Sequence, residues 1–168
     1  MRTETRLVFG HGLAAGLIGY ATVVVFFGVV NVLAGRSVFY TAALLGSALF
    51  QGLRDPSLLE ITLGTVLSYN VVHALVFVGV GMLASWLVAK TEQFPVLWLL
   101  ILLGLIFVAV HVYTALVFFA EPLIGRVAWW QIGLASLAAA FFMGWYLLTQ
   151  HPALRQELKE IATSDVSA

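Results

Sequence analysis

Charged residues are so widely spaced along this chain that the gaps between them predict its helices. Four gaps of 28 or 29 residues contain no Asp, Glu, Lys or Arg. About 20 apolar residues suffice for a helix to cross the roughly 30 Å hydrocarbon core of a bilayer, and a helix satisfies its own backbone hydrogen bonds there. Each gap therefore predicts one membrane-spanning helix. The four spans are expected near residues 8–33, 64–89, 95–119 and 127–149.

A fifth uncharged stretch, residues 37–53, is shorter and more polar than the other four. A helix over residues 41–53 would reach only about 20 Å, which is too short to cross a bilayer. We therefore predict a short interfacial or re-entrant helix between the first and second spans. The alternative is a fifth span, which would place the C-terminus on the opposite side of the membrane.

The fold predicted from these patterns is an all-α membrane protein, a bundle of four transmembrane helices over residues 1–151, followed by a tail over residues 152–168. In the tail, Leu154, Leu158 and Ile161 recur at helical spacing, which predicts a short amphipathic helix. Such a helix either lies on the membrane surface or binds a partner.

Basic and aromatic residues predict how the chain is oriented. All five Trp lie near the predicted ends of spans, where indole rings favour the headgroup level. The side that holds the N-terminus, the loop at Lys90 and the tail has five Lys and Arg, against three on the other side. Cytoplasmic loops are the more basic ones. We therefore predict a multi-pass protein of a bacterial inner membrane with both termini in the cytoplasm.

Composition removes several classes of function. Eight Lys and Arg balance eight Asp and Glu, so no basic field exists to attract nucleic acid. The chain has no Cys, which excludes disulfides, thiolate metal sites and a Cys nucleophile. The partners that remain are the lipid bilayer, another membrane protein or a second copy of this chain.

Small residues at four-residue spacing predict where the spans pack. Lipid tails are as apolar as Leu, so helices in a membrane associate through small residues that let their backbones approach. We expect these stripes to pack within one chain, and homodimerisation through the first span is the alternative. The residues concerned are Gly12, Gly16 and Gly19 in the first span and Ser136, Ala140 and Gly144 in the fourth.

Two histidines are predicted to lie at one depth in the membrane. His73 precedes Lys90 by 17 residues, and His111 follows Phe94 by the same number. At about 1.5 Å per residue, both lie roughly 25 Å from the loop between the second and third spans. An intramembrane ionisable group is a functional hypothesis by default. The other polar residues expected in this layer are Asn70, Tyr69, Thr114 and Asn31.

Three interpretations of this polar cluster remain open. The histidines hydrogen-bond their neighbours and hold the bundle together, which we favour. Alternatively, His73 and His111 ligate a haem b from opposite faces and make the chain an electron-transfer protein. In the third interpretation the cluster is a path for protons or a small molecule. His11 and His151 lie at helix ends and need no special role.

No catalytic residues are predicted. The spans contain no buried acid pair, Ser–His dyad or metal-binding helix motif, which membrane hydrolases need. Asp55, Glu60 and Glu121 fall in the outer loops. We expect a non-enzymatic protein, either a small subunit of a membrane assembly or a homo-oligomer, with no metal site other than the alternative haem.

Four short motifs stand out along the chain: Leu45-Gly46-x-x-Leu49-Phe50-x-Gly52, Trp129-Trp130-Gln131, Gly144-Trp145-Tyr146 and His151-Pro152-Ala153-Leu154-Arg155. With these motifs the chain resembles small bacterial inner-membrane proteins known only as uncharacterised four-helix proteins. The resemblance implies the fold and location already predicted and no activity, so it assigns no functional residues.

The topology can be tested with reporter fusions. A fusion at residue 91 and one at the C-terminus should both report a cytoplasmic location, whereas a fusion after residue 56 should report the periplasm. A periplasmic C-terminus would contradict the four-span topology and make residues 37–53 a true span.

Overall fold

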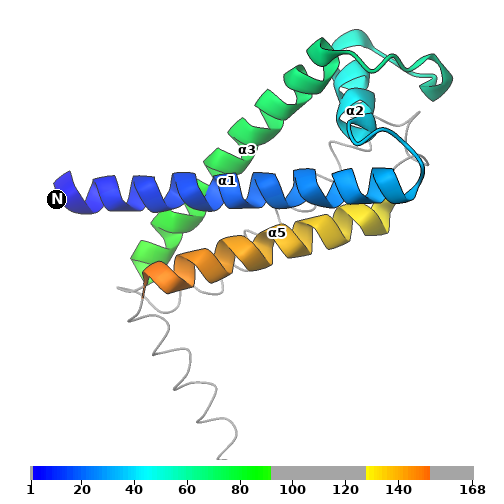
Figure 1. The fold of residues 1–168 in the computed structure, drawn as a ribbon. Helices are drawn as coiled ribbons and strands as arrows, with labels where there is room; N and C mark the ends of the chain where they lie inside the picture. The colour runs from blue at the N-terminus through cyan, green and yellow to red at the C-terminus, as the bar shows by residue number, and fades with distance from the viewer. Residues whose placement is uncertain (1, 92–127, 152–168) are drawn as a thin grey trace, which may run out of the picture.

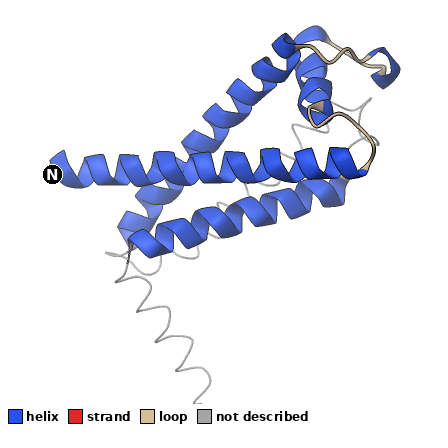
Figure 2. Cartoon of the chain, in the orientation of Figure 1, coloured by secondary structure: helices blue, strands red, loops and turns tan. Residues whose placement is uncertain are grey.

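A computed structural model describes residues 2–91 and 128–151, and all regular structure in these residues is helical (Figures 1 and 2). Three of its helices are long and apolar enough to cross a membrane, so apolar helices of sufficient length are present at three of the four predicted spans. The predicted span over 95–119 and the tail over 152–168 lie outside the described residues. The elements in order are α1 (Arg2–Leu33), α2 (Tyr40–Gln51), the 3-10 helix η1 (Pro56–Leu58), α3 (Leu63–Thr91) and α5 (Trp129–Gln150).

Helix α1 is the common partner of the other two long helices, and both run antiparallel to it (Figure 1). Helices α3 and α5 scarcely touch each other. We call the end that holds the start of α1 the His11 end and the opposite end the Asn31 end. Between α1 and α3, Val8 contacts Ser85 and Tyr20 contacts Asn70. Between α1 and the α5 segment, His11 contacts His151 and Gly19 faces Met143.

Helices α1 and α3 cross where glycines bring their backbones into direct contact. The Cβ of an alanine at Gly16 would lie 2.5 Å from the carbonyl oxygen of Phe77 and 2.6 Å from the Cα of Val78. A Cβ at Gly12 would lie 2.6 Å from the Cα of Met82. The obstructing atoms are backbone and cannot turn away, so any side chain here would force the helices apart. The first-span glycines therefore pack within the chain, against α3.

Helix α5 packs on α1 through a stripe one position away from the predicted one. The buried residues of α5 are Ala135, Ala139, Met143 and Leu147. They recur every four residues, as one face of a helix does. Across from this stripe, the space at Gly19 is closed by the sulfur of Met143 and the ring of Phe77. Gly19 therefore lies where all three long helices meet.

The predicted stripe on α5 makes no such contact in the described part of the chain. Ser136 and Ala140 are exposed, and nothing lies within 4 Å of the position that a Cβ would take at Gly144. The expected packing role of Ser136, Ala140 and Gly144 is not exercised against α1. That these residues pack against another helix, outside the described ones, stays a prediction.

Helix α2 packs across the Asn31 end, against the beginning of α3 (Figure 1). Its buried face is Thr41, Ala43, Leu44, Gly46 and Ser47. A Cβ at Gly46 would meet the carbonyl oxygen of Thr65, so the two backbones touch. Gly52, with φ of 67°, ends α2 in the left-handed conformation that glycine tolerates best. The predicted short helix over residues 41–53 is thus present over Tyr40–Gln51.

Large apolar side chains cover the outward faces of the long helices. Their extent suits a surface that contacts lipid, because a water-soluble protein rarely exposes large contiguous apolar patches. The apolar helices therefore indicate contact with a lipid bilayer. Examples that are more than two-fifths exposed are Leu17, Val25, Leu67, Leu75, Leu137 and Phe141.

The close crossing can be tested with alanine at two glycines of α1. Gly16→Ala should destabilise the protein, because its Cβ meets α3 backbone; overpacking of this kind costs about 1–3 kcal/mol. Gly10→Ala is the matched control, because nothing lies within 4 Å of that Cβ, and it should be neutral or stabilising by up to about 1 kcal/mol. Unfolding in mixed micelles followed by circular dichroism measures both. Equal free energies of unfolding for the two variants would contradict the crossing.

Candidate functional site

The strongest candidate site is the polar layer around His73, in the first half of α3. The imidazole of His73 stacks on the ring of Tyr69, with centres 5.1 Å apart and planes inclined by 22°. Phe77 contacts the imidazole from the other direction along the helix, with ring centres 4.9 Å apart. Residues four apart lie on one face of a helix, so the three rings form a continuous ladder. This ladder fixes the orientation of the imidazole.

One nitrogen of His73 has a polar neighbour, and the other has no hydrogen-bond partner among the described residues. The Nδ1 atom lies 3.4 Å from the hydroxyl oxygen of Tyr69. The Nε2 atom is buried and has no hydrogen-bond partner among the described residues. Buried polar atoms are nearly always hydrogen-bonded, and an unsatisfied one costs about 1–3 kcal/mol. A further hydrogen-bond partner would therefore stabilise this layer most at the Nε2 atom.

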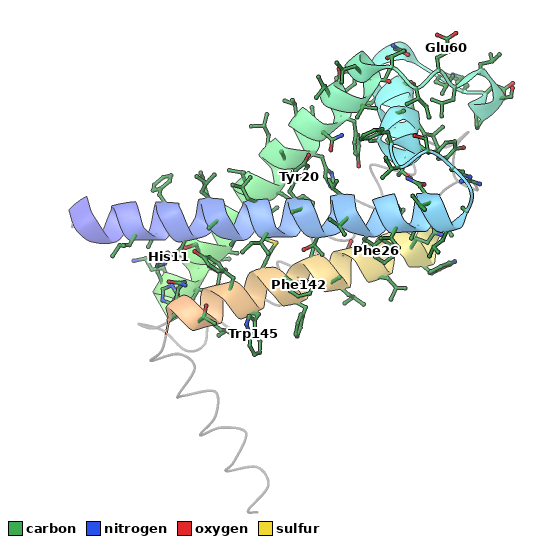
Figure 3. The ribbon with its side chains drawn as sticks, in the orientation of Figure 1. His11, Tyr20, Phe26, Glu60, Phe142 and Trp145 are labelled. Atoms are coloured by element: carbon green, nitrogen blue, oxygen red, sulfur yellow. The ribbon has the colours of Figure 1, made fainter. Side chains whose placement is uncertain are left out.

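A cross-helix hydrogen bond lies beside the imidazole. The hydroxyl of Tyr20 on α1 donates to Oδ1 of Asn70 on α3 over 2.8 Å. Asn70 in turn donates from Nδ2 to the carbonyl oxygen of Val66, also over 2.8 Å. The Tyr20 ring centre lies 5.9 Å from that of His73. Figure 3 shows Tyr20 at this position between α1 and α3. The predicted residues Tyr69, Asn70 and His73 thus lie together, with Tyr20 added.

Tyr20 is the residue that sequence reasoning missed. A signal was present, because a tyrosine in the middle of an apolar span must find a partner for its hydroxyl. The glycine spacing on the first span marks the face that packs, and Tyr20 follows Gly16 on it by four residues. Together these two features would have placed Tyr20 at the interface with α3.

Asn31 belongs to a separate network at the Asn31 end. Its Oδ1 accepts a hydrogen bond of 2.9 Å from the hydroxyl of Thr41 on α2. Its Nδ2 donates to the carbonyl oxygen of Val38 over 3.3 Å. Asn31 and Thr41 are 3 % and 6 % exposed, so both are enclosed. The structure therefore uses Asn31 to tie the end of α1 to α2, and it does not bring Asn31 to His73.

The remaining two members of the predicted cluster, His111 and Thr114, lie outside the described residues. Their expected position level with His73 stays a prediction.

The described polar layer is equipped for hydrogen bonding. It consists of two phenols, a carboxamide and an imidazole, and it contains no carboxylate. Glu60 lies on the loop between α2 and α3, away from Tyr20 (Figure 3). Within residues 2–91 and 128–151, no group of three or more His, Asp and Glu side chains converges as a metal site would require. These groups can hold helices together or hold a small polar ligand.

Comparisons with known proteins add no family to this picture. The chain matches no protein-family model, no curated protein and no solved structure.

The bond between Tyr20 and Asn70 can be tested with a double-mutant cycle. Tyr20→Phe should lower the free energy of unfolding by about 0.6 kcal/mol and at most about 1.7 kcal/mol, the range for interhelical hydrogen bonds in membranes. Combining it with Asn70→Ala should show coupling of similar size. Thr22→Val is the control, because the Thr22 hydroxyl donates to the carbonyl oxygen of Ile18 in its own helix, and it should not couple to Asn70. Absence of coupling between Tyr20 and Asn70 would contradict the assigned bond.

Proposed function

We propose that this chain is a non-enzymatic integral membrane protein that acts through helix packing, as a small subunit of a membrane assembly or as a homo-oligomer. The observation that carries this proposal is how its polar groups are used. Tyr20, Asn70, Asn31 and Thr41 each hydrogen-bond across an interface between described helices. These side chains are occupied in holding helices together, so few polar groups of the described residues are left to take part in a reaction.

A second observation supports a packing role. The stripe Ser136, Ala140 and Gly144 is not used by α1 and lies beside the stacked rings of Phe141 and Trp145. Small residues flanked by large apolar ones are what helices in membranes use for close association. The stripe is suited to a further helix, from a partner or a second copy.

We further propose four spans, with both termini on the cytoplasmic side of a bacterial inner membrane. Thr91 ends α3 at the His11 end, whereas Trp129 begins α5 at the Asn31 end. The intervening chain must return from one end to the other, and it contains the apolar run 95–119. This supports a fourth span. For α2, a length of 12 residues, about 18 Å, and a position across the bundle end support an interfacial or re-entrant helix.

For His73 we propose a structural role, in which its Nε2 atom pairs with a polar group at its own depth. The partner expected from the sequence is the hydroxyl of Thr114 or a backbone carbonyl. The unpartnered state of Nε2 among the described residues supports such a pairing independently of the depth calculation.

The buried Nε2 atom of His73 also bears on the haem alternative. An axial imidazole needs one nitrogen without a hydrogen bond, and Nε2 of His73 meets that condition. Of the two proposed axial ligands, His73 lies among the described residues and His111 does not, and Tyr69 and Phe77 pack closely on the ring of His73. The third candidate is a path for protons or a small molecule through the cluster. In that case Nε2 of His73 would be the atom that contacts the proton or the molecule.

One native preparation in mild detergent tests the proposal. The protein, purified from its native membrane without a histidine tag, should run either with stoichiometric partner chains or at a multiple of its own 18.2 kDa mass. Native mass spectrometry distinguishes the two. A monomer without partners would contradict both forms of the proposal. An Ala140→Leu variant should weaken the association, whereas Leu134→Ala, on an exposed position outside the stripe, should not.

The absorption spectrum of that preparation separates the roles of His73. A structural His73 gives a colourless protein, and His73→Gln should cost about 1 kcal/mol or less because Gln keeps a hydrogen bond. A Soret band that shifts on reduction, and that is lost in both His73→Ala and His111→Ala, would replace the structural role with haem ligation.

A further inference from the structure

The His11 end brings together two histidines that lie 140 positions apart in the sequence. The ring centres of His11 on α1 and His151 at the end of α5 are 5.9 Å apart, with planes at 86°. The ring of Tyr146, one turn back along α5, lies 6.5 Å from that of His11. Figure 3 shows His11 on the side of α1 that faces the end of α5. The antiparallel packing of α1 and α5 creates this pair, and the sequence alone gives no sign of it.

The pair lies where the apolar spans end. The span of α1 begins at Leu7, so His11 falls in its first turns, and His151 directly follows the span that ends at Gln150. Both imidazoles are half-buried. An ion from the aqueous phase can therefore reach them without entering the apolar interior, whereas His73 lies far from this end along α3.

We propose that His11 and His151 form a two-imidazole site for a divalent transition-metal ion of the Zn²⁺, Ni²⁺ or Cu²⁺ class. An ion about 2.0–2.1 Å from one nitrogen of each ring places the ring centres roughly 5–6.5 Å apart, depending on the angle at the metal. The observed separation of 5.9 Å falls in that range. Each ring can turn about its metal–nitrogen bond, so the angle between the planes is free to take the observed value.

The donor set selects the class of ion. Neutral imidazole suits zinc, copper and nickel, whereas calcium and magnesium prefer oxygen ligands. No third His, Asp or Glu side chain joins the pair among the described residues, so water completes the coordination and the ion exchanges readily. Tyr146 acts as a positioning residue, because its ring packs edge-on against His11 and limits how far the imidazole can turn.

Metal binding at this site would join the beginning of α1 to the end of α5. These two helices pack through small side chains and Met143. A bridging ion would add a direct link between the beginning of one helix and the end of the other. Because the ion binds the folded arrangement of both helices, it stabilises that arrangement by mass action.

The test uses the full chain in mild detergent, free of any histidine tag, titrated with ZnCl₂ and CuCl₂. Calorimetry should show one ion per chain, and Zn²⁺ should raise the thermal transition temperature. Loss of a group that merely supports a ligand already costs about 10–100-fold in metal affinity. His11→Gln and His151→Gln should therefore each weaken binding by at least about tenfold. His73→Gln and Thr22→Val should retain binding to within a few-fold.

The ligands can also be counted without any variant. Electron paramagnetic resonance of the Cu²⁺-loaded wild-type protein should show coupling to two imidazole nitrogens, and each Gln variant that folds should show one. No saturable binding to the wild-type chain, coupling to fewer than two nitrogens, or wild-type affinity in both Gln variants would each overturn the proposal. Circular dichroism and elution volume establish which variants are folded before their affinities are compared.

Discussion

The backbone contact between α1 and α3 is the constraint on which the rest of the described structure depends. Gly12 and Gly16 leave no room for a side chain against Met82, Phe77 and Val78. In lipid no hydrophobic gain drives helices together, so association relies on dispersion forces and hydrogen bonds that act only at short range. Glycine allows that range to be reached. Once the backbones touch, α1 and α3 are held at a crossing from which their ends diverge (Figure 1).

Hydrogen bonds on either side of the crossing depend on it and secure it. Toward the His11 end, the hydroxyl of Ser85 donates to the carbonyl oxygen of Val8 over 2.9 Å, and Ser85 is fully buried. Toward the Asn31 end, Tyr20 bonds Asn70. Each such bond in a membrane contributes only about 0.6 kcal/mol on average, so their main effect is to fix register. A shift of α3 along α1 would break both at once.

The diverging half of the α1–α3 pair explains why α2 is needed. Beyond Tyr20 the two helices separate, and α2 packs at the open end with its buried face toward α3. Local chemistry prepares this arrangement. Thr62 and Thr65 exchange hydrogen bonds between side chain and backbone at the start of α3, as in a capping box. Gly46 then admits the backbone of Thr65. The result encloses Asn31 and Thr41, which are 3 % and 6 % exposed.

The sequence by itself determined which segments are helices. Uncharged runs in hydrocarbon have no other way to satisfy their backbones, so α1, α3 and α5 were predicted to within a few residues at most ends.

Only the tertiary structure decided which face of each helix packs. Apolar residues surround these helices on all sides because lipid and protein interior are alike, so periodicity cannot separate the two faces as it does in water. Hence α5 packs on α1 through Ala135 and Ala139, and the predicted Ser136 and Ala140 do not. For the same reason Tyr20 joined the polar layer around His73, Asn31 did not, and the pairing of His11 with His151 was visible only after α1 and α5 were placed side by side.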